Sequence, residues 1–218
     1  MPQQTFGFSH AEDCKKTVTR LRRGIFAGCP SNFFDFTGVR MNITKAKSLM
    51  LASARAAIPA YSRLVGMTTT FICEDGFALP VRWEASNFAH LCGLDYYTDG
   101  TRTRRYPYVK LYEHIAAGKR ISERQLAPNG DPRWLPYKAE AITGAFHLDK
   151  AEVIVESGNS RILFYTGNTV WCIGVGYDRE HDYYYPQSLV RKSYEKAMKP
   201  GSAIHRIDRI EYRPTTDG

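Results

Sequence analysis

The chain has 218 residues, of which 43% are hydrophobic and 24% are charged, and its formal net charge is +8. This length supports one full core, or a core with a smaller helical annex, and the composition excludes a disordered protein. The positive charge favours a polyanionic partner, because clustered Lys and Arg displace counterions from phosphate, although charge alone also fits a merely soluble protein.

The five cysteines are odd in number and widely spread, with no C-x-x-C pair. This pattern argues against a zinc module or a disulfide framework and favours a reducing compartment. Residues 1–16 lack the apolar centre of a signal peptide, and no later run approaches the length of a membrane span. We therefore expect a cytoplasmic protein with no membrane partner.

Two helices are expected in residues 1–65, which we predict to form a basic helical N-terminal region. The first covers residues 9–27, where apolar residues at helical spacing follow a Ser start signal. The second is expected from a Thr44 cap until Pro59 interrupts or kinks it. The first helix carries five positive charges within nine residues: Lys15, Lys16, Arg20, Arg22 and Arg23. These charges predict either a phosphate-facing surface or a solvated helix face.

The character of the sequence changes near Gly66, where β-prone residues begin. Residues 68–73 and 77–83 are expected to form a hairpin around the turn at 74–76. A short apolar segment with His90 at its centre follows, and it stops at Gly93. After a basic loop, helices are expected over 108–117 and 136–148.

Short β-prone runs separated by turn signals occupy the rest of the chain, at 152–156, 162–165, 170–177, 183–185 and 203–212. Helices followed by consecutive short strands predict an α+β fold with helices packed on an antiparallel sheet. We expect this domain to cover residues 66–213 and residues 214–218 to form a frayed tail.

The common cofactor and metal motifs are absent from the sequence. It has no G-x-x-x-x-G-K-[ST], G-x-G-x-x-G or H-E-x-x-H motif and no acidic cluster suited to magnesium. We therefore expect no cofactor and no metal site. Any phosphate chemistry would use proton transfer and fixed cations.

The segment Ser86–Leu94 resembles the Asn-Phe-x-His-Leu-x-Gly element of phage-encoded nuclease-like domains of the barnase, EndoU, colicin and RelE group. Later elements follow in the order that such domains show, namely Phe164-Tyr165-Thr166, Cys172-Ile173-Gly174, Asp178, residues 184–189 and Ile207-x-x-Ile210. The resemblance covers residues 68–213. It implies a barnase/RelE-like fold and metal-independent RNA cleavage in a toxin or phage-related setting. Gln187-Ser188 departs from it by replacing an expected Asn-Thr pair.

Cleavage of this kind begins when a base takes the proton of a ribose 2′-hydroxyl, which only RNA offers. The oxygen attacks the adjacent phosphorus, and an acid protonates the departing 5′-oxygen. His90 is the expected acid or base, since imidazole exchanges protons near neutral pH. The competing interpretation is that His90 packs its segment against the sheet. His205 is the candidate for the second proton transfer.

Cations and hydroxyls complete the expected site. Arg161, Arg191 and Lys192 are expected near the charge that builds on the phosphorane, although each alone also fits a surface charge. The hydroxyls of Tyr165, Thr166 and Ser188 are expected to hold a non-bridging oxygen or relay a proton, and Tyr165 also fits a packing role. Further arginines expected to contact the substrate are Arg102, Arg104 and Arg105.

The sequence thus predicts an endoribonuclease with RNA as its partner and, as a further partner, a cognate antitoxin or inhibitor protein. Two alternatives remain. One is an RNA-binding module that has lost catalysis, and the other is a phage structural or interaction protein whose tyrosine-rich strands form an interface.

Overall fold

The computed structural model describes residues 32–34 and 40–215. The predicted helix over 9–27, with Lys15, Lys16, Arg20, Arg22 and Arg23, lies outside the described residues. No helix in the described part of the chain combines the length and the apolar character that crossing a bilayer requires.

A short antiparallel ribbon, β1 (Asn32–Phe34) with β2 (Arg40–Asn42), precedes the long helix α1 (Ile43–Ser62). Asn42 caps this helix, because its Oδ1 accepts a hydrogen bond from the backbone N–H of Lys45 at 2.8 Å. The cap is therefore Asn42 and not Thr44. Pro59 does not end the helix, which continues to Ser62 and brings the fully buried Tyr61 into an aromatic cluster.

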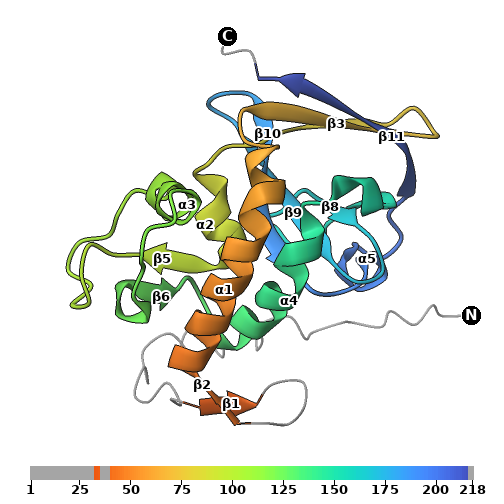
Figure 1. Ribbon diagram of the computed structural model, residues 1–218. Helices are drawn as coiled ribbons and strands as arrows, with labels where there is room; N and C mark the ends of the chain where they lie inside the picture. The colour runs from red at the N-terminus through yellow and green to blue at the C-terminus, as the bar shows by residue number, and fades with distance from the viewer. Residues whose placement is uncertain (1–31, 35–39, 216–218) are drawn as a thin grey trace, which may run out of the picture. The chain divides into compact units, whose positions relative to one another are not determined.

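The remaining helices are α2 (Asn87–Cys92), α3 (Val109–Ala116), α4 (Leu135–Ala145) and α5 (Tyr194–Ala197), with single 3-10 turns at Glu123–Gln125, Pro132–Trp134 and Leu148–Lys150. α1 and α4 pack side by side (Figure 1). Tyr61 of α1 contacts Trp83, Phe88 and Phe146, which joins α1, α2 and the end of α4 in one core. The expected helices over 108–117 and 136–148 are confirmed as α3 and α4.

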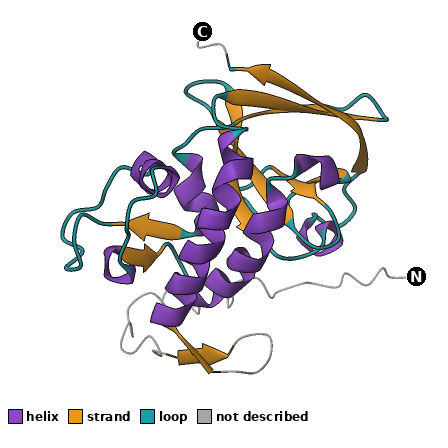
Figure 2. Ribbon diagram, in the orientation of Figure 1, coloured by secondary structure: helices purple, strands orange, loops and turns teal. Residues whose placement is uncertain are grey.

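Seven strands form the main sheet: β3 (Met67–Cys73), β4 (Ala78–Arg82), β7 (Val153–Glu156), β8 (Phe164–Gly167), β9 (Cys172–Asp178), β10 (Tyr183–Val190) and β11 (Ile204–Pro214). Their order is β10-β4-β3-β11-β7-β8-β9, and the sheet closes into a barrel. A separate ribbon pairs β5 (Leu94–Tyr96) with β6 (Leu126–Pro128) beside α3 (Figures 1 and 2).

The mixed α and β content agrees with the expected α+β class, but the simple antiparallel sheet is a correction. The sheet closes because β11 is long enough to pair with two strands, with β7 through 204–206 and with β3 through 207–214. A parallel bridge between Tyr184 and Val81 joins β10 to β4. β11 also includes Pro214, which was expected in the tail.

The strand register sorts side chains onto two faces. Thr166 lies opposite Ile154 and Ile173, which belong to the core shared with the helices, and we call this the helix-side face. Tyr165 lies opposite Val155, in a smaller core with Ala197 of α5, and we call this the α5-side face. Neighbouring residues on one strand therefore serve different surfaces.

Candidate active site

His90 lies on the short helix α2, and specific interactions mark both ends of this helix. At the first residue, Asn87, the side-chain Oδ1 accepts a hydrogen bond from the backbone N–H of Glu84 at 2.9 Å. After the helix, Gly93 adopts a left-handed conformation with φ of 67°. A Cβ at Gly93 would lie 2.9 Å from Lys138 Cδ, so glycine serves both the turn and the close approach of α4.

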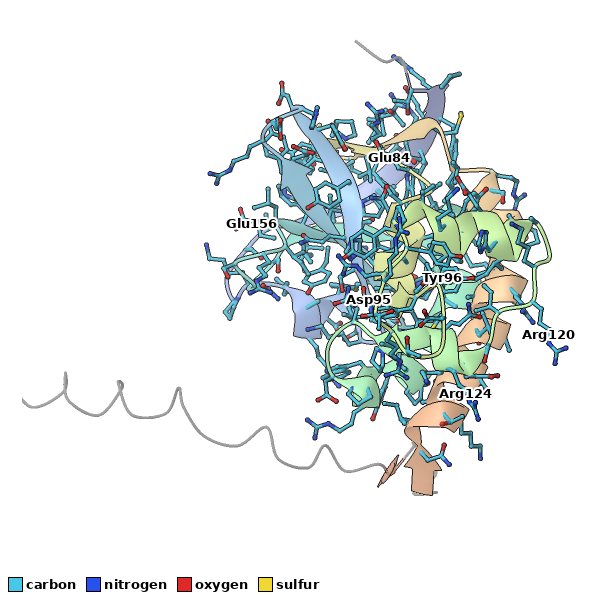
Figure 3. All side chains as sticks on the ribbon, turned by 90° about the vertical axis from the view of Figure 1, so that its left-hand side faces the viewer. Glu84, Asp95, Tyr96, Arg120, Arg124 and Glu156 are labelled. Atoms are coloured by element: carbon cyan, nitrogen blue, oxygen red, sulfur yellow. The ribbon has the colours of Figure 1, made fainter. Side chains whose placement is uncertain are left out.

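The half-buried His90 ring lies against Tyr108, with 4.1 Å between ring centroids. Arg105 Nη1 donates to the Tyr108 hydroxyl at 3.0 Å and pairs with Asp95 Oδ1 at 3.3 Å. The Arg105 guanidinium carbon also lies 4.7 Å from the centroid of the Tyr108 ring. Figure 3 views the molecule from the side of β5, where Asp95 is labelled. An imidazole, a phenol and a guanidinium therefore meet at one place.

Burial lowers the pKa of His90 below its ordinary value, and the positive charges of Arg105 and Lys138 lower it further, while Asp95 opposes them. The imidazole is therefore neutral at pH 7. A neutral imidazole can accept a proton, which is the state that a general base requires.

Lys138 of α4 extends its ammonium between α2 and β10. Its Nζ donates to the carbonyl oxygens of Leu189 at 2.8 Å and Leu91 at 3.4 Å. Burial lowers the pKa of Lys138 to about 8. Its charge therefore acts in a region where water screens it poorly. We call His90, Asp95, Arg105, Tyr108 and Lys138 the His90 cluster.

Basic residues of the loop before α3 border two cavities. Arg104 and Arg105 line one of about 540 Å³ together with Thr98, Tyr106 and Pro107. Arg102 lines another of about 440 Å³, where Lys47 and Arg124 add positive charge. The three arginines expected to contact substrate are all exposed.

Three other predicted residues come together on the α5-side face. Tyr165 and Ser188 lie opposite the same residue, Gly174, from β8 and β10. Lys192 Nζ lies 5.7 Å from the centroid of the Tyr165 ring. Burial raises the pKa of Tyr165, so its hydroxyl keeps its proton at neutral pH.

The register separates His205 from that group. His205 lies opposite Ile154, which lies opposite Thr166, so His205 shares the helix-side face with Thr166 and not the face of Tyr165. Its Nδ1 lies 2.7 Å from Asp75 Oδ2, and its ring stacks on Phe77 at 4.2 Å. Thr166 is buried, and its Oγ1 has no hydrogen-bond partner among the residues that the structure describes.

Arg161 and Arg191 are both exposed. Arg161 lies in the turn before β8, and Arg191 pairs with Glu140 of α4 at 2.7 Å. Their catalytic roles, like those of the other predicted site residues, stay predictions. Across the described ranges, no group of three or more His, Cys, Asp and Glu side chains is arranged to hold a metal ion.

Sequence reasoning missed Lys138, Tyr108 and Asp95. A signal for Lys138 existed, because it is three residues after Leu135 and four before Ile142, on the buried stripe of α4. A lysine on an apolar stripe needs a polar partner inside the fold. Asp95 and Tyr108 gave no such signal, because their meeting depends on how the loop 97–107 folds back.

Comparison with protein families matches residues 55–209 to the model described as phage-Barnase-EndoU-ColicinE5/D-RelE like nuclease4. The match confirms the family resemblance and begins within α1, before the start expected at residue 68. No curated protein and no solved structure matches the chain.

Proposed function

Because the chain belongs to the family of phage-barnase-EndoU-colicin E5/D-RelE-like nucleases, we propose that it cleaves RNA by attack of a ribose 2′-hydroxyl on the adjacent phosphorus. The products are a 2′,3′-cyclic phosphate and a free 5′-hydroxyl, and the reaction uses no metal. The observation that carries the proposal is the contact of the half-buried His90 imidazole with Tyr108, whose hydroxyl accepts a hydrogen bond from Arg105.

Each member of the cluster has a role in this proposal. The His90 imidazole accepts the proton of the 2′-hydroxyl. The Arg105 guanidinium and the Lys138 ammonium stabilise the charge that builds on the phosphorane oxygens. The Tyr108 hydroxyl accepts a hydrogen bond from Arg105, so its own proton is available for the departing 5′-oxygen. Asp95 holds Arg105 in position through its ion pair.

Ser188 is connected to the His90 cluster through the next residue on β10, Leu189. The carbonyl of Leu189 accepts the hydrogen bond from Lys138. A phosphate bound near Lys138 would therefore lie close to the backbone that carries Ser188. Tyr165 and Lys192 lie on the opposite, α5-side face, so in this proposal they would contact a part of the RNA away from the scissile bond.

The biological setting follows the family. We propose that the protein is a toxin or phage-related effector of the cytoplasm, that RNA is its substrate, and that an antitoxin or inhibitor protein restrains it. The exposed Arg102, Arg104 and Arg105 would bind the phosphates of RNA or the carboxylates of an acidic inhibitor.

The test compares two oligonucleotides that differ at one position. One is a ribo-oligonucleotide, and the other carries a single 2′-deoxy nucleotide at the cleavage position mapped on the first. The wild type should cut only the first. H90Q should lose roughly 10²- to 10⁴-fold in rate while it stays folded, and H147Q, which changes an exposed histidine outside the cluster, should not. Cleavage of the 2′-deoxy substrate would refute the mechanism.

A further inference from the structure

A cavity of about 670 Å³ opens beside the β9–β10 hairpin, and it is not part of the His90 cluster. The ends of β3, β4 and β11 form its other walls. Its volume is in the range of pockets that hold small organic ligands. We call it the tyrosine pocket after the three tyrosines in its lining, Tyr177, Tyr183 and Tyr184. Thr68, Arg82 and Arg213 also line it.

The tyrosines of the pocket are held in place by their neighbours. Tyr184 contacts Tyr177, with 4.9 Å between ring centroids, and Phe164, with 6.1 Å. The Tyr183 hydroxyl donates to Glu84 Oε1 at 3.4 Å, and the Arg82 guanidinium carbon lies 5.0 Å from the centroid of the Tyr183 ring. These three rings remain partly exposed. Tyr177 and Tyr184 contact each other, whereas Tyr183, which precedes Tyr184 on β10, is held separately by Arg82 and Glu84. Rings held in this way lose little entropy when a ligand meets them.

Polar groups surround the rings. Arg213 stands at the rim with 76% of its side chain exposed and pairs with Glu211 at 3.0 Å. The Thr68 hydroxyl lies 3.1 Å from that of Thr215. The lining also contains Asp182, which accepts the hydrogen bond of the Tyr177 hydroxyl. The site therefore combines aromatic rings, hydroxyl groups, a carboxylate and an exposed cation.

We propose that the tyrosine pocket binds an unpaired base of the RNA substrate. Bases stack on aromatic side chains whatever their sequence, since every base has a π face. Arg213 would contact the phosphate that follows the stacked base. A paired base cannot enter, because its faces are covered by its neighbours in the duplex. The pocket therefore makes the protein select single-stranded RNA.

The pocket connects to the His90 cluster through one short stretch of chain. The Glu84 carboxylate forms an ion pair with Arg82 at 3.0 Å and accepts a hydrogen bond from the Tyr183 hydroxyl. The backbone N–H of Glu84 donates a hydrogen bond to the side chain of Asn87, the first residue of α2. His90 lies six residues after Glu84, so their Cα atoms are at most ~20 Å apart. Glu84 and Asp95, at the two ends of this path, are labelled in Figure 3. One strand could thus span both sites, and this inference rests on the proposed function.

The experiment measures binding of a fluorescent 2′-O-methyl oligonucleotide, which has no free 2′-hydroxyl and cannot be cut. Y183A should weaken binding about 5- to 100-fold, the cost of one lost base stack, and Y183F should bind like the wild type. R213Q should weaken binding and make its dependence on salt shallower by about one phosphate contact. Y212A is the matched control, because Tyr212 is a partly exposed tyrosine on β11 that lines a different cavity.

The same oligonucleotide annealed to its complement should bind more weakly than the single strand. Equal affinity of Y183A and wild type for the single strand would overturn the inference, and so would equal affinity of wild type for both forms. Failure of the proposed function would be a separate result. If the protein shows the expected binding pattern but leaves ribo-oligonucleotides intact, the tyrosine pocket binds an unpaired base and the proposed cleavage activity is wrong.

Discussion

Lys138 offers a direct test of the electrostatics of the His90 cluster. Its pKa falls from 10.5 to about 8 in the folded protein, because burial disfavours the ammonium. Between these values the unfolded chain binds more protons at this position than the folded chain, so its contribution to stability rises with pH. The whole change corresponds to about 3 kcal/mol, and about 2 kcal/mol of it falls between pH 7 and pH 9.5.

The variant K138M removes this titration and keeps an unbranched side chain. Urea denaturation of both proteins at pH 7 and pH 9.5 gives the free energy of unfolding at each pH. The wild type should gain about 2 kcal/mol relative to K138M over this interval. The buried thiol of Cys73, whose pKa is raised to about 11, is common to both proteins and cancels in the difference.

The control is K119M, which changes an exposed lysine at the end of α3. The free energy difference between K119M and wild type should be the same at both pH values. The reasoning fails if K138M also runs parallel to the wild type, because Lys138 would then be solvated and its charge would be screened. It could not stabilise a phosphorane in the way proposed.

Three further predictions concern activity and RNA affinity. R105Q should lower the rate of RNA cleavage roughly 10²- to 10³-fold, with R105K intermediate because an ammonium keeps the charge but lacks the planar fork of donors that holds Tyr108 and Asp95 in fixed positions. Single-turnover kinetics measure this, and unchanged rates would remove Arg105 from the mechanism. The midpoint of the fall in cleavage rate on acidification should lie below pH 6.5, because the pKa of His90 is lowered and the base must be neutral. A midpoint above pH 6.5 in a pH–rate profile would contradict this. Neutralising Lys15, Lys16, Arg20, Arg22 and Arg23 together should weaken RNA binding and flatten its salt dependence in a titration over salt concentration, and an unchanged slope would favour a protein partner for that region.

Local patterns predicted most of the elements. Alternating β-prone residues and turn signals located the hairpin of β3 and β4, and the left-handed Gly93 ended the His90 segment where its sequence indicated. The barrel could not be predicted in the same way. Its closure depends on β11 pairing with β7 and β3, which are separated by more than 70 residues, and no local pattern encodes that choice.

The candidate site was predicted only in part for the same reason. His90 was found because its own segment is distinctive, whereas Asp95 and Tyr108 reach it through a loop whose path is set by tertiary contacts. Tyr165 and Thr166 are consecutive and were both expected at the site, yet the pleat sends them to opposite faces. Only the register between strands decides which of them shares a surface with His205 or Ser188. The domain boundary near Gly66 stays a prediction.

The central claim is that the His90 cluster cuts RNA through the 2′-hydroxyl without a metal. The most direct measurement incubates the purified protein with total cellular RNA in excess chelator and determines the chemistry of the new ends. We expect 2′,3′-cyclic phosphate and 5′-hydroxyl ends with the wild type and none with H90Q. Intact RNA, or 5′-phosphate ends, would contradict the account.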